Sequence, residues 1–173
     1  KVKENIVFVS DELFFLPGAT MSKMADFYSS IYDRFNYDRF LKLAELFELN
    51  IKKPIANFSK GMKRQASIML ALSTRAKYMF FDETFDGLDP VMRNLVKKLI
   101  CNDVAEYDTT VIVTSHSLRE LEDICDHLAL LHKGGLVLDS DVLELKTTQF
   151  KVQIAFKGIF GKTKFEGLNI TRY

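Results

Sequence analysis

This sequence of 173 residues has little cysteine, few long apolar runs and almost no excess of charge of one sign. The two cysteines, Cys101 and Cys125, stand singly without metal-ligand spacing, and nothing in the sequence supports a disulfide. Both fall in apolar-periodic stretches, so we expect two buried thiols in a reducing compartment. No apolar run is long enough to span a membrane and no secretory signal opens the chain, which favours a cytoplasmic protein.

The charge balance also narrows the choice of partners. The formal net charge is +1, which gives no electrostatic reason to expect nucleic acid or an anionic membrane surface as a partner. Hydrophobic residues make up 47% and charged residues 27% of the chain, as in ordinary soluble globular proteins. A chain of this length can build one domain with a substantial core.

Strand-like and helix-like segments alternate through the middle of the chain. Short apolar segments predict strands at residues 6–9, 78–81 and 109–114. Ser59 is expected to cap a helix that ends near Arg75, and Asp89 with Pro90 is expected to open another. The buried stripe of that second helix is predicted at Val91, Leu95, Leu99 and Ile100. This alternation favours an α/β layered fold with a mainly parallel sheet.

The two flanks of this region have patterns of their own. Residues 21–49 show helical apolar spacing that is interrupted near Asn36, which predicts two short helices. Residues 128–138 predict a hairpin, because two apolar segments enclose a turn that contains two glycines. After Phe150 the pattern becomes alternating, so residues 150–173 are expected to begin a separate appendage.

The most informative segment joins a strand to two carboxylates. The apolar run 78–81 reads as a fully buried strand of a parallel sheet, and Asp82 and Glu83 follow it directly. Open α/β sheets place their chemistry at the carboxyl ends of their strands. Two neighbouring carboxylates at such an edge suit nucleotide hydrolysis, where one holds Mg²⁺ and the other activates water. An acidic helix start is the alternative interpretation of the same residues.

Two further features suit phosphate chemistry. Ser59 and Gly61 lie at a predicted helix start, where free amides and the helix dipole favour an anion and Gly61 allows close approach. An ordinary capped helix is the alternative there. His116 follows the strand 109–114 and is expected at the same sheet edge as the carboxylates. Ser117 and Glu120 match a capping box for the short helix that comes next.

In this order and spacing, the elements resemble the ATP-binding subunit of ABC transporters over about residues 4 to 146. Residues 58–62 (FSKGM) are similar to the LSGGQ signature, 78–83 to the Walker B strand and 86–89 to the D-loop, and His116 is similar to the switch histidine. The resemblance implies a P-loop NTPase-like fold that is incomplete at its N-terminus. It implies an ATPase domain over 1–149 with a helical subdomain at about 20–75, and a C-terminal appendage over 150–173.

The resemblance also implies roles for particular residues. Two subunits would enclose two ATP molecules, with Asp82 holding Mg²⁺ and Glu83 polarising the attacking water. His116 would contact the γ-phosphate. Ser59 and Gly61 would touch the nucleotide of the partner subunit, and Asp89 would form contacts across the dimer. The partners implied are a second ATP-binding subunit and a transmembrane permease, with the protein peripheral on the inner face of the membrane.

Some positions depart from the family pattern. Lys60 replaces a glycine, Met62 replaces a glutamine, Thr84 stands where proline is usual, and Asp11 aligns with the Q-loop glutamine. No GxxxxGK[ST] phosphate loop occurs in these residues, so we expect this stretch alone to bind Mg-ATP poorly and to be inactive. The resemblance favours an exporter-type transporter. A heteromeric dimer, a soluble ABC-type ATPase acting on ribosomes or DNA, and a non-catalytic interaction module remain as alternatives.

Overall fold

The computed structural model describes residues 2–148, and the chain divides into two compact units, Lys1–Cys125 and Asp126–Tyr173. Among the described residues, no helix has both the length and the apolar character needed to cross a membrane. The predicted appendage at 150–173 lies outside the described residues, and the predicted domain boundary near 150 stays a prediction. The observed division after Cys125 was not foreseen from the sequence.

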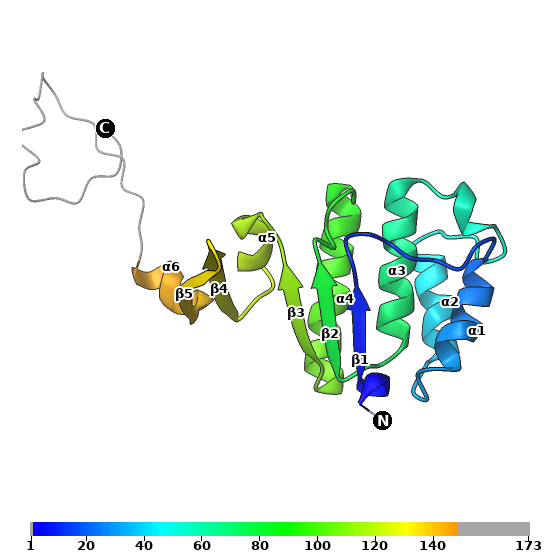
Figure 1. The fold of residues 1–173 in the computed structure, drawn as a ribbon, viewed down its shortest axis with the longest axis horizontal. Helices are drawn as coiled ribbons and strands as arrows, with labels where there is room; N and C mark the ends of the chain where they lie inside the picture. The colour runs from blue at the N-terminus through cyan, green and yellow to red at the C-terminus, as the bar shows by residue number, and fades with distance from the viewer. Residues whose placement is uncertain (1, 149–173) are drawn as a thin grey trace, which may run out of the picture. The chain divides into compact units, whose positions relative to one another are not determined.

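The first unit is built on a three-stranded parallel sheet. Its strands are β1 (Ile6–Val9), β2 (Tyr78–Asp82) and β3 (Thr110–Thr114), and β2 lies between the other two (Figure 1). The register pairs Phe8 with Phe80 and Phe80 with Ile112, so equivalent positions form straight rows across the sheet. The three strands were predicted, and the α/β class with a parallel sheet is confirmed.

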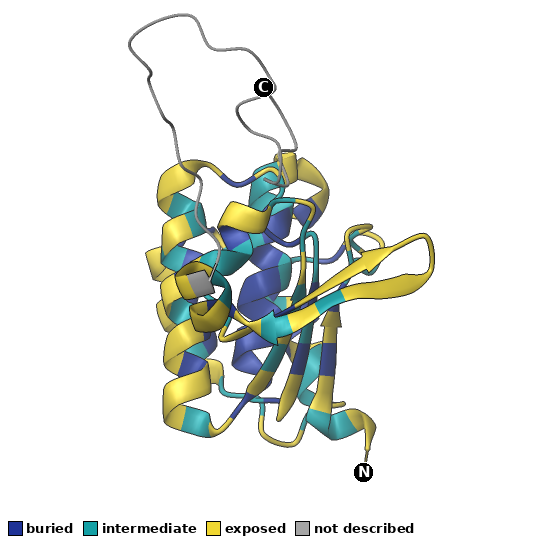
Figure 2. Cartoon of the chain, turned by 90° about the vertical axis from the view of Figure 1, so that its left-hand side faces the viewer, coloured by how far each residue is buried: buried dark blue, intermediate teal, exposed yellow. Residues whose placement is uncertain are grey.

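Helices cover one face of this sheet. α3 (Lys60–Ser73) and α4 (Pro90–Tyr107) both lie on that face, as Figures 1 and 2 show from two directions. The strand residues that point toward these helices are buried: Val7, Val9, Met79 and Phe81. They join the inward side of α3 in a single apolar core, which contributes most of the free energy that stabilises this unit.

The opposite face of the sheet is much more exposed. Phe8 is 58% exposed and Ile112 is 51% exposed, while Phe80 between them is half-buried. Tyr78 at the start of β2 is also exposed, so the prediction of a fully buried 78–81 strand is wrong. Only every second residue of the strand is buried, because the described helices of this unit pack on one face alone.

The helical part lies beside α3. α1 (Met21–Ser29) and α2 (Tyr37–Leu46) both contact α3, and they are the two helices predicted for this stretch. Asn36 ends the interruption between them, because its side-chain oxygen accepts a hydrogen bond from the Arg39 amide and starts α2. Two short 3-10 turns, η1 (Lys3–Asn5) and η2 (Ile55–Asn57), complete the connections.

The buried stripe of α4 agrees only in part with the prediction. Ile100 is buried as predicted and Leu95 and Leu99 are half-buried against the core, but Val91 is 78% exposed. The fully buried residues of the helix are Val96, Lys97, Ile100 and Asp103. Two of these four are charged, so apolar spacing alone could not locate the stripe. Cys101 on the same helix is exposed and Cys125 is half-buried, so the expectation of two buried thiols is wrong.

The second unit is described up to residue 148. It contains the antiparallel strands β4 (His127–His132) and β5 (Gly135–Asp141), which form the predicted hairpin, followed by α6 (Val142–Thr148). His127 hydrogen-bonds through both ring nitrogens, to Asp141 at 3.0 Å and to Asp139 at 2.5 Å. These hydrogen bonds raise the pKa of His127 above its ordinary value.

Candidate functional site

The candidate site lies where β2 and β3 end at the same edge of the sheet. Asp82 is the last residue of β2 and Glu83 follows it, while Thr114 ends β3 two residues before His116. The register pairs Asp82 with Thr114 directly. Parallel pairing therefore brings Asp82, Glu83 and His116 to one edge, as the sequence predicted.

Thr114 joins the two strand ends and was missed in the sequence. Its hydroxyl donates to Asp82 Oδ1 at 2.5 Å, and its carbonyl oxygen accepts from the Glu83 amide at 3.2 Å. The hydroxyl oxygen also lies 3.3 Å from that amide nitrogen. Thr114 thus fixes one oxygen of Asp82 and the backbone of Glu83. Its position at the end of a neighbouring strand was the signal that could have revealed this.

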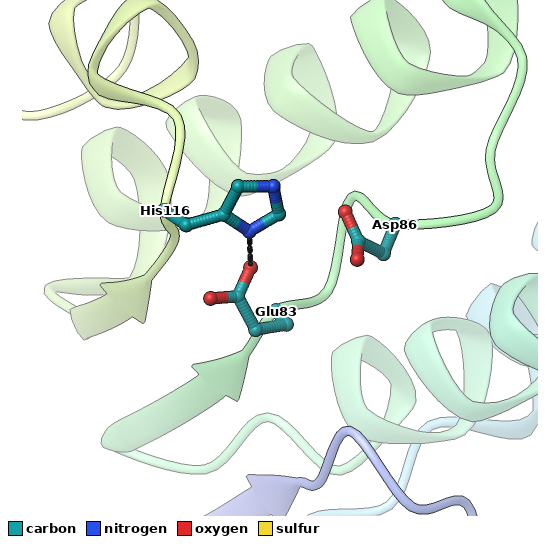
Figure 3. A group of neighbouring side chains, drawn as sticks. All are labelled: Glu83, Asp86 and His116. Carbon is teal, nitrogen blue, oxygen red and sulfur yellow. Dashed lines mark hydrogen bonds and ion pairs between the residues drawn. The ribbon is translucent and has the colours of Figure 1, made fainter.

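Glu83 and His116 form a direct pair. His116 Nδ1 lies 3.0 Å from Glu83 Oε2, and Figure 3 shows the two side chains pointing toward each other with Asp86 beside them. The hydrogen bond to Glu83 and the charges of Glu83 and Asp86 raise the pKa of His116 above its ordinary value. A protonated ring donates from Nδ1 to Glu83 and keeps Nε2 as a second donor.

Glu83 reaches this partner through an uncommon backbone conformation. Its φ angle is 46°, in the left-handed region that residues other than glycine seldom adopt. The residue after it, Thr84, is fully buried, and its hydroxyl oxygen has no hydrogen-bond partner among the described residues. The turn that follows β2 is held by the burial of Thr84 and Phe85 and by backbone hydrogen bonds from Asp86 to Glu83 and from Leu88 to Phe85.

Carboxylates suitable for a divalent cation gather at this edge. One donor atom each of Glu83, Asp86 and His116 lies within 4.8 Å of the others. Asp82, the metal ligand predicted from the sequence, is outside this group and accepts a hydrogen bond from the Thr114 hydroxyl through Oδ1. A carboxylate anchored at one oxygen, with the other left for an ion, is a fitting ligand for Mg²⁺.

Ser59 and Gly61 lie at the start of α3, next to the 86–89 turn. The Ser59 hydroxyl oxygen accepts from the Met62 amide at 3.2 Å and caps α3, as predicted. A Cβ added to Gly61 would lie only 2.9 Å from the carbonyl oxygen of Gly87. The absence of a side chain at Gly61 therefore lets the helix start and the 86–89 turn lie against each other, a contact that sequence reasoning did not identify.

Lys60 and Asp89 have structural partners within the chain. The aliphatic stem of Lys60 lies 3.9 Å from the position of a Cβ built on Gly87, so Lys60 packs over the same turn. Asp89 Oδ1 accepts from the amides of Val91 at 2.9 Å and Met92 at 3.0 Å, which makes Asp89 the cap of α4. Its predicted contact across a dimer stays a prediction.

Asp11, at the position that aligns with the Q-loop, is bound by a buried arginine. Arg64 is 1% exposed, and its Nη2 lies 2.7 Å from Asp11 Oδ1. Arg64 also donates to the carbonyl oxygens of Ser10 at 2.9 Å and Asp11 at 3.2 Å. The guanidinium of α3 thereby fixes the loop that follows β1.

Comparison with known proteins identifies the family of the chain. Residues 21–122 match the family model described as "AAA domain, putative AbiEii toxin, Type IV TA system". The ABC transporter ATP-binding protein YtrB of Bacillus subtilis is 33% identical over 156 residues, covering 90% of this chain and 53% of that protein. The linearmycin resistance ATP-binding protein LnrL of the same species is 30% identical over 142 residues, covering 79% of this chain and 45% of that protein.

A solved ATP-binding subunit of an ABC transporter has the same fold. It superposes with a TM-score of 0.76 at 21% identity, covering 83% of this chain and 62% of that one. The chain thus spans about half the length of YtrB and LnrL, its bacterial relatives named above. The family model matches more than half of its residues, and the chain belongs to the AAA-domain family and, with these relatives, to the ATP-binding proteins of ABC transporters.

Proposed function

We propose that this chain is part of an ATP-hydrolysing subunit that powers an ABC transporter and acts as a dimer with two ATP molecules at the interface. The observation that carries the proposal is the Glu83–His116 pair beside Asp82 at the carboxyl edge of a parallel sheet. Phosphoryl transfer to water needs mainly positioning and charge stabilisation, which fixed acidic and imidazole groups supply.

Each residue at the edge has a distinct part in this proposal. Asp82, anchored by Thr114, would hold Mg²⁺, and the bound ion would neutralise charge on the phosphates. Glu83 accepts a proton from, or orients, the attacking water. His116, held through Nδ1 by Glu83, uses Nε2 to donate to a γ-phosphate oxygen. The raised pKa of His116 favours the protonated ring that does so.

The proposal includes partners that the chain does not contain. Ser59 and Gly61, at the start of α3, would contact the nucleotide bound by a second subunit, and Asp89 would lie near the dimer interface. A transmembrane permease would hold the protein on the inner face of the membrane. An exporter type is favoured because similar proteins are named for resistance to linearmycin and for bacitracin transport.

The second candidate is a non-catalytic subunit of a heteromeric dimer. The ion pair between Arg64 and Asp11 favours it, because Asp11 is engaged where the family has a glutamine near the nucleotide. The paired Glu83 and His116 favour catalysis instead. The two functions differ in whether ATP hydrolysis depends on Glu83.

The decisive experiment is the substitution Glu83→Gln in the full-length protein. Because a glutamine keeps the shape of the side chain but cannot accept a proton, kcat should fall by about a hundredfold or more. ATP affinity should stay within about threefold, since binding does not require a proton acceptor. The trapped ATP should shift the protein to a dimer, which size-exclusion chromatography with light scattering can detect.

Glu45→Gln is the matched control. Glu45 is an exposed glutamate on α2, so the same loss of one charge there should leave kcat unchanged. Unchanged hydrolysis in Glu83→Gln would refute the catalytic assignment. Wild-type protein that binds ATP without hydrolysing it would instead favour the non-catalytic subunit.

A further inference from the structure

A partly buried ion pair connects the two helices that follow the segments bearing the candidate site. Arg93 Nη1, on α4, lies 2.7 Å from Glu120 Oε1 on α5 (Leu118–Glu122). Glu120 is only 9% exposed, although glutamate is seldom buried without strong partners. The capping box predicted for Ser117 and Glu120 is absent, because the Glu120 carboxylate is turned to Arg93 and Ser115.

One end of this ion pair reaches the turn after β2. Arg93 Nη2 donates to the carbonyl oxygen of Leu88 at 3.2 Å. Leu88 belongs to the 86–89 turn, and the same turn lies against Gly61 through Gly87. The planar guanidinium can bind the carboxylate and the carbonyl oxygen at once, which a lysine ammonium at this position could not do with the same geometry.

The other end reaches both neighbours of His116. The Ser115 hydroxyl donates to Glu120 Oε2 at 2.9 Å, and the Ser117 amide donates to that hydroxyl oxygen at 3.0 Å. Glu120 thus uses one oxygen for Arg93 and the other for Ser115. The backbone on each side of His116 is thereby tied to α5.

We infer that Arg93 and Glu120 are positioning residues that hold the 86–89 turn and the His116 loop in one fixed arrangement. Within residues 2–148 neither side chain hydrogen-bonds to Glu83 or His116, although the charge of Glu120 helps to raise the pKa of His116. Their hydrogen bonds end at Leu88 in the 86–89 turn and at Ser115, the residue before His116. The inference rests on the proposed function only where it concerns turnover, since the contacts themselves stand without it.

The chain offers a matched control in a second ion pair. Lys97 Nζ, one turn further along α4, lies 3.1 Å from Asp123 Oδ2, directly after α5. This pair connects the same two elements, but within residues 2–148 neither partner's side chain has a hydrogen bond to the 86–89 turn or to residues 115–117. Breaking the Lys97–Asp123 pair tests whether a weaker attachment of α5 to α4 is by itself enough to lower kcat.

The experiment compares Arg93→Lys, Glu120→Gln and Asp123→Asn in the full-length protein. Arg93→Lys keeps the charge but loses the simultaneous bond to Leu88, and Glu120→Gln keeps the shape but loses the charge. We expect both to lower kcat about tenfold or more, with the KM for ATP changed less than about threefold, because misplaced groups slow turnover more than binding. Asp123→Asn should leave kcat within about twofold of the wild type.

Amide hydrogen exchange gives a readout that does not depend on turnover. Arg93→Lys and Glu120→Gln should speed exchange in both segments, 86–89 and 115–117, while Asp123→Asn should not. Unchanged exchange, or equal loss of kcat in Asp123→Asn, would overturn the inference. Wild-type protein without ATP hydrolysis would refute the proposed function alone, and the exchange data would still decide the positioning role.

Discussion

Glu83 combines three properties that rarely meet in one glutamate. It has a positive φ, its amide is bound by Thr114 of the next strand, and its carboxylate is bound by His116. A residue in a sparsely populated backbone conformation persists only when its surroundings hold it there. The side chain is therefore aimed by the backbone as well as by its partner, which suits a group that must orient a water molecule.

The first residue-scale prediction concerns the pKa of His116. Because the hydrogen bond to Glu83 is the largest cause of the raised pKa, Glu83→Gln should lower it toward the ordinary value of 6.5. Asp86→Asn should lower it less, since Asp86 acts through charge alone. The pKa can be read from the chemical shift of the His116 ring during an NMR pH titration.

The sign of the pH dependence follows from the direction of this shift. A raised pKa in the folded protein means that the pair stabilises the fold fully at pH below the ordinary histidine pKa. This contribution is lost as the pH rises through the raised value. If Glu83→Gln left the His116 titration unchanged, the two side chains would not be paired in solution.

At the scale of elements, the start of α3 and the turn after β2 form one interface. Gly61 and Gly87 approach so closely that the interface has no room for a side chain on the helix. Lys60 packs its stem over the same turn, so the residue that departs from the family glycine has a structural partner here. The signature-like segment and the D-loop-like turn are therefore in direct contact.

The element-scale prediction replaces Gly61 by alanine. Helix propensity alone would favour alanine by about 1 kcal/mol. The added Cβ would lie 2.9 Å from the Gly87 carbonyl oxygen, and backbone cannot move aside as a flexible side chain can. We expect a net destabilisation of about 1–3 kcal/mol, typical of overpacking, measured by urea denaturation.

Ser67→Ala on the same helix is the control for this substitution. It adds helix propensity at a half-buried position without approaching the 86–89 turn, so it should change stability by less than about 0.5 kcal/mol. A stabilised Gly61→Ala protein would mean that the two segments lie further apart than the structure shows.

The elements that sequence could locate are those defined by local chemistry. Asn36, Ser59 and Asp89 each cap a helix through a side-chain oxygen, and a cap needs only neighbouring amides. Features that depend on distant partners were missed. Glu120 bonds to Arg93 on another helix in place of Ser117, and Lys97 is buried on α4 because Asp123 pairs with it.

The residues of the candidate site also divide into those that the sequence could predict and those that depend on distant partners. The strand ends predicted Asp82, Glu83 and His116 at one edge, because parallel strands align their carboxyl ends. Thr114 was missed, because its place at a strand end indicates only that it is near the site, and its bond to Asp82 depends on the register of the two strands. The contact of Gly61 with Gly87 was also hidden, since a glycine at a helix start indicates close approach without identifying the approaching group.

At the scale of the whole first unit, the sheet is covered unevenly. Parallel sheets are normally buried on both faces, yet here the described helices of this unit lie on one face only. The register places Phe8, Phe80 and Ile112 in one row on the other face, where Phe8 is 58% and Ile112 is 51% exposed. A contiguous apolar row of this kind favours association.

The last prediction follows from that row. A polypeptide of residues 1–173 should associate reversibly at micromolar concentrations, and the double substitution Phe8→Lys and Ile112→Lys should shift it to the monomer. Two cations at the two ends of the row, on β1 and β3, would be costly to bury against another apolar surface. Val104→Lys, at a comparably exposed apolar site on α4, is the control and should leave association unchanged. Sedimentation velocity measures all three proteins, and equal association of the double variant would show that another surface is responsible.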